Sequence, residues 1–280
     1  MEISRSSFYY RPHKPLPEQQ FEDSLKKRIE EIARENPGYG QRRIYRELRR
    51  DKSGTYKTVN HKRVERLVRE MNLQCRQPKA YRVTTNSNHK FPRYPNLIKD
   101  IIPTGINQIW VADITYIHLL RGFVYLAAIL DLFSRKVIGY ALSLTLDASF
   151  AVEALKMAIE RRHPAPGCIH HSDHCVQYAC REYTDVLKEH GLVSSMAKQG
   201  SPYENASAES FFKTFKYEEV HLNEYHTVDD VIERVPYFIE QVYNAKRLHS
   251  SLGYVPPDEF ESLAVVCNQA DTQSATSPGF

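Results

Sequence analysis

The sequence predicts an α/β (α+β mixed) domain that follows a small all-α module, within a chain of 280 residues. Three short helical patterns precede residue 77, whereas three strand patterns and then alternating helices and strands follow residue 106. The net charge changes sign near the same place. Residues 1–100 contain 24 Lys and Arg against 12 Asp and Glu, whereas residues 101–280 contain 14 Lys and Arg against 22 Asp and Glu. A basic module ahead of an acidic domain indicates nucleic-acid binding, although a solvated Arg-rich surface gives the same count.

The composition is that of an ordinary globular protein, with 41% hydrophobic and 26% charged residues. No apolar run approaches the roughly 20 residues of a membrane span, and the first residues lack the apolar core of a signal peptide. The odd number of cysteines, five, argues against a disulfide framework. We therefore expect a cytoplasmic, nucleoid-associated protein with no membrane partner.

The all-α module is expected over residues 21–76, after an extended arm over residues 1–20. Apolar residues recur at helical spacing in three segments that Gly-containing turns separate: Glu22–Glu35, Gln41–Asp51 and Thr58–Met71. Three short helices with a basic third helix are typical of a helix-turn-helix module. We expect DNA contacts from six basic side chains: Arg42, Arg43, Lys62, Arg63, Arg66 and Arg69. A helical bundle that docks on a protein partner is the alternative.

A polar linker over residues 77–106 leads into a core over residues 107–262, and a disordered tail is expected over residues 263–280. Apolar segments bounded by turn residues predict core strands at Ile109–Ile117, Phe123–Asp131, Lys136–Ser143, Cys168–His171 and Leu192–Met196. Helical patterns predict Ala148–Arg162, Arg181–His190 and a long helix at Asn205–Val220.

Three acidic residues stand out by their local context. Asp113 lies inside an otherwise apolar strand, where a carboxylate is costly unless it is paired or bound to a metal. Asp173 follows a strand, at the end where α/β sheets usually bind ligands. Glu209 shares a helix face with Asn205 and Lys216, so a metal ligand would lie beside a residue that can hold a DNA phosphate. Three such acids are what a two-metal phosphoryl-transfer site needs.

A zinc site is the alternative interpretation of a nearby segment rich in metal-binding side chains. It contains Cys168, His170, His171, His174, Cys175 and Cys180. Their spacing fits no common zinc pattern, and the segment is already committed to holding Asp173.

The motifs together resemble one family, the OrfB-type (DDE) transposases of insertion sequences, whose catalytic core is similar to retroviral integrase. Six segments carry the resemblance in the expected order: Tyr39–Ile44, Trp110–Tyr116, Asp131–Gly139, His171–Asp173, Glu204–Lys213 and Tyr243–Tyr254. The resemblance covers about residues 5–260. It implies an RNase H-like core with Asp113, Asp173 and Glu209 as catalytic metal ligands, and the family's spacing of 35 residues between the last two is kept.

The resemblance also implies a reaction and its partners. The reaction is cleavage at the element ends and joining of the 3′-OH to target DNA, with two Mg²⁺ ions per active site, or Mn²⁺ in their place. Lys216 and Asn205 are expected at the DNA. A homo-oligomer on DNA is expected, and the protein of an upstream frame is a further candidate partner.

Two cysteines depart from the family pattern. Glycine is usual at Cys175, and cysteine would be strained there if the turn needs a positive φ; a small polar residue is usual at Cys180. This departure keeps open a catalytically impaired DNA-binding remnant or a regulator of transposition. An RNase H-like nuclease that cuts RNA–DNA hybrids is a third hypothesis.

Overall fold

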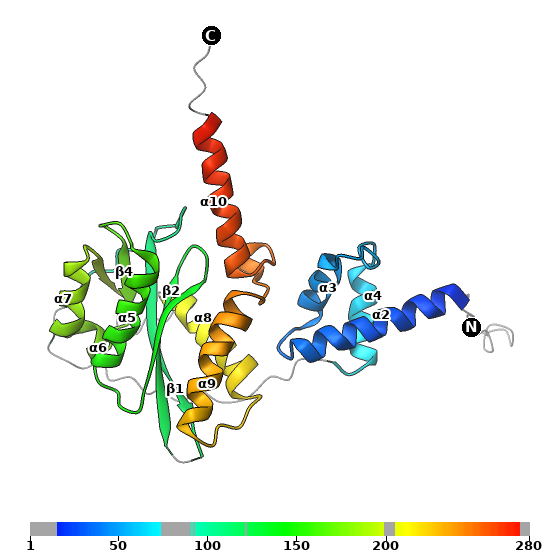
Figure 1. The fold of residues 1–280 in the computed structure, drawn as a ribbon, viewed down its shortest axis with the longest axis horizontal. Coiled ribbons are helices and arrows are strands. Elements are labelled where there is room, and N and C mark those ends of the chain that lie inside the picture. Colours follow the sequence, from blue (N-terminus) through cyan, green and yellow to red (C-terminus); the bar gives the residue numbers. More distant parts are fainter. Residues whose placement is uncertain (1–15, 74–90, 92, 121, 199–204, 275–280) are drawn as a thin grey trace, which may run out of the picture. The chain divides into compact units, whose positions relative to one another are not determined.

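The computed structural model describes residues 16–73, 91, 93–120, 122–198 and 205–274. The chain forms two compact units, Met1–Gln77 and Pro78–Phe280 (Figure 1). The division falls within one residue of the boundary that the sequence predicts between the all-α module and the linker. Most of the predicted linker before residue 93 lies outside the described residues. Among the described residues, every helix is too short or too polar to span a bilayer.

The first unit is built from three helices, as predicted. They are α2 (Leu16–Glu35), α3 (Gln41–Arg50) and α4 (His61–Glu70). Each buries one apolar stripe, which includes Leu25 and Ile29 of α2 and Leu67 of α4. Residues 16–20 of the predicted extended arm are helical, so the prediction of an arm was wrong there. Pro17 is compatible with the helix because it lies in the first turn, where its missing N–H costs no backbone hydrogen bond.

The second unit contains a five-stranded mixed sheet in the order β3-β2-β1-β4-β5, which confirms the predicted mixed α/β class (Figure 1). Its strands are β1 (Ile109–His118), β2 (Phe123–Asp131), β3 (Val137–Ser143), β4 (Ile169–Ser172) and β5 (Val193–Met196). β1, β2 and β3 form an antiparallel meander, whereas β4 pairs parallel with β1 and β5 parallel with β4.

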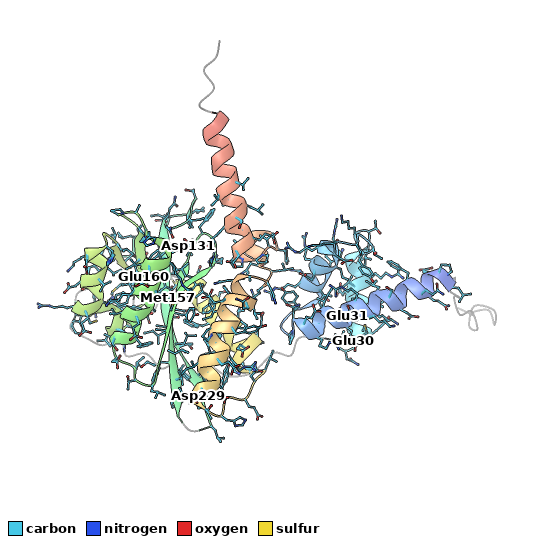
Figure 2. All side chains as sticks on the ribbon, viewed as in Figure 1. Glu30, Glu31, Asp131, Met157, Glu160 and Asp229 are labelled. Atoms are coloured by element: carbon cyan, nitrogen blue, oxygen red, sulfur yellow. The ribbon has the colours of Figure 1, made fainter. Side chains whose placement is uncertain are left out.

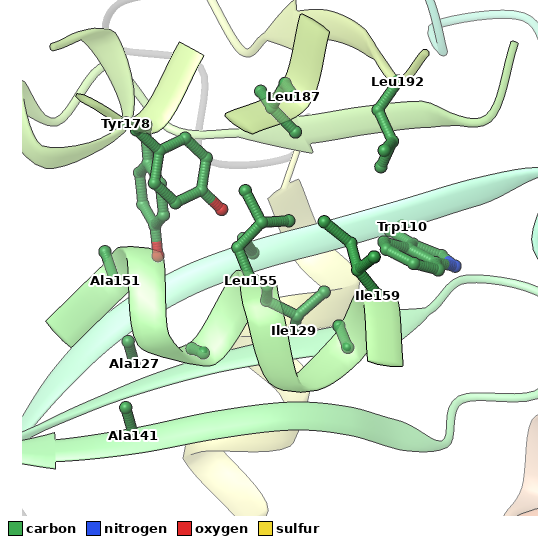
Figure 3. Close-up of a cluster of buried hydrophobic side chains, with 14 of the residues drawn as sticks. Trp110, Ala127, Ile129, Ala141, Ala151, Leu155, Ile159, Tyr178, Leu187 and Leu192 are labelled. Atoms are coloured by element: carbon green, nitrogen blue, oxygen red, sulfur yellow. The ribbon is translucent and has the colours of Figure 1, made fainter. Parts of the chain in front are cut away.

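Helices cover both faces of this sheet, and the strand residues alternate between the two faces. Trp110 and Ala112 pack toward α5 (Ser149–Arg162), α6 (Val176–Ala179) and α7 (Arg181–Glu189) (Figure 3). Ile109 and Val111 pack toward the other face, with α8 (Ala206–Phe215), α9 (Val228–Tyr237) and the π-helical η3 (Phe238–Asn244). By this alternation Asp113 lies on the α8 face.

The C-terminal segment is helical where the sequence predicts disorder. After the short η4 (Ser250–Leu252), α10 spans Pro257–Ser274, so the prediction was wrong for residues 263–274. Asp258 and Glu259 in the first turn favour its start. Buried Glu261 then anchors the helix, because it accepts hydrogen bonds from Arg162 and from Ser134 at 2.6 Å.

The turn after β2 is organised by one buried carboxylate, Asp131 (Figure 2). Its oxygens accept hydrogen bonds from the backbone N–H groups of Asn107, Phe133 and Ser134. Burial raises the pKa of Asp131, and these hydrogen bonds oppose that rise. The turn is therefore tied both to the start of β1 and, through Ser134, to α10.

Helix α5 packs against β3 so closely that only glycine fits at residue 139. A Cβ atom there would lie 2.3 Å from the carbonyl oxygen of Ala154 and 2.8 Å from the Cβ of Ala158. Since backbone atoms cannot yield as a flexible side chain does, the helix would have to move away from the sheet.

We expect Gly139→Ala to lower the free energy of unfolding by about 3 kcal/mol, measured by urea denaturation. Gly105→Ala is the matched control, because its Cβ would meet at 3.3 Å the flexible end of Gln108. Equal stability of the two variants would contradict the close packing of α5 on β3.

Candidate active site

The parallel pairing of β1 with β4 brings two of the predicted acids together. Val111 is opposite His171 and Ala112 is opposite Ser172. The next residues along the two strands are Asp113 and Asp173, so their side chains emerge at adjacent positions where β4 ends. The carboxylate of Asp113 accepts a hydrogen bond from Ile114 N–H at 2.8 Å. That of Asp173 accepts one from Cys175 N–H at 3.1 Å.

Asn205 connects the third acid to this pair. Its Nδ2 donates to the carbonyl oxygen of Ala112 at 3.1 Å, which fixes the start of α8 beside β1, one residue before Asp113. Glu209 follows in the first turn of α8, with an exposed side chain. Asn205 itself is only 5% exposed, and DNA contact by this residue stays a prediction. Its carboxamide is used to hold two elements together.

The three carboxylates repel one another. The pKa of Asp113 is raised well above its ordinary value by desolvation, then by the charges of Asp173 and Glu209, and is lowered less by the Ile114 N–H and by Lys216. Desolvation also raises the pKa of Glu209. Added positive charge near Asp113 would favour its ionised form, as the charge of Lys216 already does.

The donor set fits divalent magnesium or manganese. Carboxylate oxygens are the hard ligands that Mg²⁺ prefers, and two added positive charges would offset the repulsion that acts on Asp113. In the described part of the chain, however, no three His, Cys, Asp or Glu side chains are gathered closely enough to hold one ion between them. Asp113 and Asp173 are the adjacent pair, and Glu209 stands apart on α8.

Lys216 lies where α8 changes its hydrogen bonding. The sequence predicts one helix from Asn205 to Val220, whereas the α-helix ends at Phe215 and continues as the π-helical turn η2 (Lys216–Val220). Desolvation lowers the pKa of Lys216, and the charge of Asp113 opposes that effect. The ammonium group therefore lies near Asp113.

Two glutamates, part-buried Glu218 and buried Glu219, hold η2 from different sides. Glu218 forms a bidentate ion pair with Arg247, with N–O distances of 2.7 and 2.8 Å. Glu219 accepts hydrogen bonds from Tyr225 at 2.8 Å and from Arg234 at 2.9 Å. Because consecutive side chains are drawn to different partners, the turn is wider than an α-helical turn. Its geometry depends on contacts that sequence spacing does not reveal.

Cys175 is not strained. Its φ of −82° and ψ of 143° are extended backbone, which cysteine adopts as readily as any residue. Its thiol donates to Gln177 Oε1 at 2.7 Å, and burial raises its pKa to about 12. Burial likewise raises the pKa of Cys168 to about 12. Among the described residues, no three His, Cys, Asp or Glu side chains are close enough to share one ion, so the zinc interpretation has no structural support.

The predicted basic residues of the first unit differ in their surroundings. Arg63 and Arg66 both donate to buried Glu22, at 2.8 and 3.1 Å, and thereby join α4 to α2. Arg69 pairs with Glu65 at 3.2 Å. Of the other three, Arg42 and Lys62 are exposed, and Arg43 lies over the Tyr39 ring. DNA contact stays a prediction for all six, and two of them also stabilise the unit.

Comparison with known proteins gives matches over most of the chain. Models described as "Integrase core domain" match residues 103–202 and 190–257, and one described as "HTH-like domain" matches residues 20–81. An uncharacterised 31 kDa protein of insertion element IS600 from Shigella sonnei is 37% identical over 92% of this chain and 94% of its own length. Transposase InsF of IS3A from Escherichia coli K12 is 35% identical over 82% of this chain and 79% of its own length.

Solved structures with a similar fold include the HTLV-2 integrase catalytic core in complex with magnesium. It matches 56% of this chain and 98% of its own, with 13% identity and a TM-score of 0.44. The family models and the observed sheet topology agree with the RNase H-like core that the sequence resemblance implies.

We expect Asp113→Asn to raise the free energy of unfolding by about 1 kcal/mol at pH 8 in EDTA, because it removes a buried charge that its neighbours repel. The folded-state pKa of Asp113 is raised, so its stabilising contribution is present in acid and is lost as pH rises through that pKa. The difference in free energy of unfolding between Asp113→Asn and the wild type should therefore become smaller as the pH is lowered.

Mn²⁺ should then stabilise the wild type more than Asp113→Asn, because only the wild type keeps the full donor set. Asp185→Asn, an exposed change on α7, is the control and should respond to Mn²⁺ as the wild type does. A variant less stable than wild type in EDTA, or an equal response of both to Mn²⁺, would contradict the charge repulsion inferred at this site.

Proposed function

Because the chain belongs to the IS3 family of insertion-sequence transposases, of the OrfB type, with an integrase core and an N-terminal HTH-like domain, we propose that Asp113, Asp173 and Glu209 are its catalytic residues. The reaction we propose is metal-dependent cleavage at the ends of the element, followed by joining of the freed 3′-OH to target DNA. The observation that carries the proposal is the pairing of β1 with β4, which brings Asp113 beside Asp173, with the pKa of Asp113 raised by burial and then by the charges of Asp173 and Glu209.

Each residue has a distinct task in this proposal. Asp113, Asp173 and Glu209 would hold two Mg²⁺ ions, or Mn²⁺ in their place, which when bound stabilise the attacking and leaving oxygens of an in-line displacement at phosphorus. Lys216 would bind a phosphate oxygen next to the scissile bond, since its ammonium lies near Asp113. Asn205 is a positioning residue that keeps α8, and with it Glu209, beside β1.

The partners follow from the two units. The HTH-like unit implies DNA binding, and we propose that its arginines and lysines contact phosphates at the element ends. A homo-oligomer that joins two ends, and association with the protein of an upstream frame, are further parts of the proposal.

The hypothesis of a catalytically impaired remnant was based on strain at Cys175. Because the backbone there is extended and unstrained, that reason for the hypothesis no longer applies. We therefore expect Cys175→Gly to leave activity unchanged; a large gain of activity in that variant would restore the remnant hypothesis.

The test is resolution of a branched DNA that mimics the strand-transfer product, with Mn²⁺ and the purified chain. This substrate already joins the reacting ends, so a missing end-recognition partner matters less. We expect the wild type to resolve the branch, and Asp113→Asn and Glu209→Gln to lose at least about a hundredfold in rate while still binding DNA. Glu160→Gln, an exposed change on α5, is the control and should react as the wild type does (Figure 2).

Two results would contradict the proposal. The first is full activity of either acid variant. The second is hydrolysis of an RNA–DNA hybrid by the wild type without any joining activity on branched DNA, which would instead support an RNase H-like nuclease.

A further inference from the structure

The β1–β2 hairpin extends past both neighbouring strands (Figure 1), and its end, residues 117–118 with 123–124, is a two-stranded ribbon that begins just after Tyr116. The pairing of β4 with β1 ends at Ala112, and that of β3 with β2 ends at Tyr125. In the described part of the chain, β1 beyond Ala112 is therefore paired by β2 alone. The backbone N–H of Leu120, at the tip, donates to the carbonyl oxygen of Tyr225 at 3.2 Å, which holds the ribbon in place.

Three aromatic rings gather on one face of this ribbon. The ring centroids of Tyr116 and His118 are 5.1 Å apart, those of Tyr116 and Phe123 are 5.6 Å apart, and those of His118 and Phe123 are 4.7 Å apart. His118 is exposed and Phe123 is 45% exposed, so the cluster presents ring surface to solvent. A hydrophobic core would cover such rings, and here two of the three stay open.

Lys216 links the ring cluster to the acids. Its Nζ lies 4.7 Å from the centroid of the Tyr116 ring, and its charge also acts on Asp113. Residues 113 and 116 of one strand point to opposite faces of the sheet. Lys216 can meet both only across the edge of β1 that β4 leaves unpaired, so the acids and the rings lie on either side of the same open edge.

We propose that Tyr116, His118 and Phe123 form a stacking platform for a nucleobase of DNA whose phosphate backbone passes Lys216, adjacent to the scissile phosphate. The proposal rests on the proposed function, because it assumes that DNA reaches the acids. Aromatic rings beside a lysine are what proteins use to bind unpaired nucleotides, since every base has a π face and the cation attracts the phosphate. The base must be unpaired, because a paired base offers no free face inside a duplex.

The occupant is DNA rather than a second copy of this chain, because the surface is continuous with a cation and with the proposed catalytic acids. A contact between copies would need an apolar partner surface, whereas Lys216 favours an anionic one.

The test is a double-mutant cycle between the base and a ring. The probes are branched DNAs in which an abasic site replaces, one at a time, each of the three nucleotides on either side of the junction, bound by the full chain with Ca²⁺ in place of Mn²⁺. We expect one abasic position to weaken wild-type binding about tenfold. An abasic site at the same position should not weaken DNA binding by Phe123→Ala. In Phe123→Trp the abasic site should weaken binding again.

Tyr237→Ala is the matched control, because Tyr237 is an aromatic residue of α9 that is 58% exposed and away from the hairpin. The abasic site that weakens DNA binding by the wild type should weaken binding by Tyr237→Ala by the same factor. The platform is excluded if Phe123→Ala and the wild type respond alike at all six positions, or if Phe123→Ala instead changes the oligomeric mass measured by light scattering. Because binding is measured without turnover, a failed branch-resolution test leaves this cycle interpretable, and the two failures are distinguishable.

Discussion

The constraint on which the rest of this structure depends is the burial of one carboxylate, Asp113, next to a second, Asp173, at the edge where β4 ends and β1 continues. Parallel pairing places Asp113 beside Asp173, and no rearrangement of side chains alone can separate two residues in adjacent register. Glu209 adds a third negative charge from α8. The site is therefore unfavourable in isolation, and a ligand of opposite charge would relieve the repulsion.

Much of the surrounding structure keeps these acids from moving apart. Asn205 ties α8 to the Ala112 carbonyl, and the Arg247–Glu218 ion pair holds the turn that carries Lys216. Breaking a buried pair such as Arg247–Glu218 leaves an uncompensated charge, which typically costs about 3 to 5 kcal/mol. The free energy that these contacts contribute to folding offsets the cost of burying negative charges close together. Such a balance between stability and activity is common in enzymes.

The sequence was sufficient where the physical signal is local. Apolar runs separated by turn residues predicted both β1 and β2, and an acid inside an apolar strand drew attention to Asp113. The burial of Asn205 could not be predicted, because its partner lies 93 residues earlier in the chain. The helix after residue 262 was missed for the same reason, since Glu261 is anchored by Arg162, 99 residues away.

The backbone at Cys175 shows the opposite limit, in which a family pattern misleads. A glycine usual at that position suggested a positive φ, but the chain is extended there. The sequence therefore indicated the candidate acids, but it did not indicate the contacts of Asn205 and Arg247 that hold the surrounding elements in place. The aromatic cluster on the hairpin gave no signal either, because its three rings are separated by a turn and become neighbours only after β1 and β2 pair.

The central claim, that the three acids hold a pair of divalent ions, is tested most directly by electron paramagnetic resonance of the protein bound to branched DNA with Mn²⁺. Two ions about 3.5–4 Å apart should be spin-coupled, and the account predicts a coupled-pair spectrum at two equivalents of Mn²⁺. The coupled signal should disappear in Glu209→Gln. A spectrum of isolated Mn²⁺ ions alone in the wild type would contradict the account.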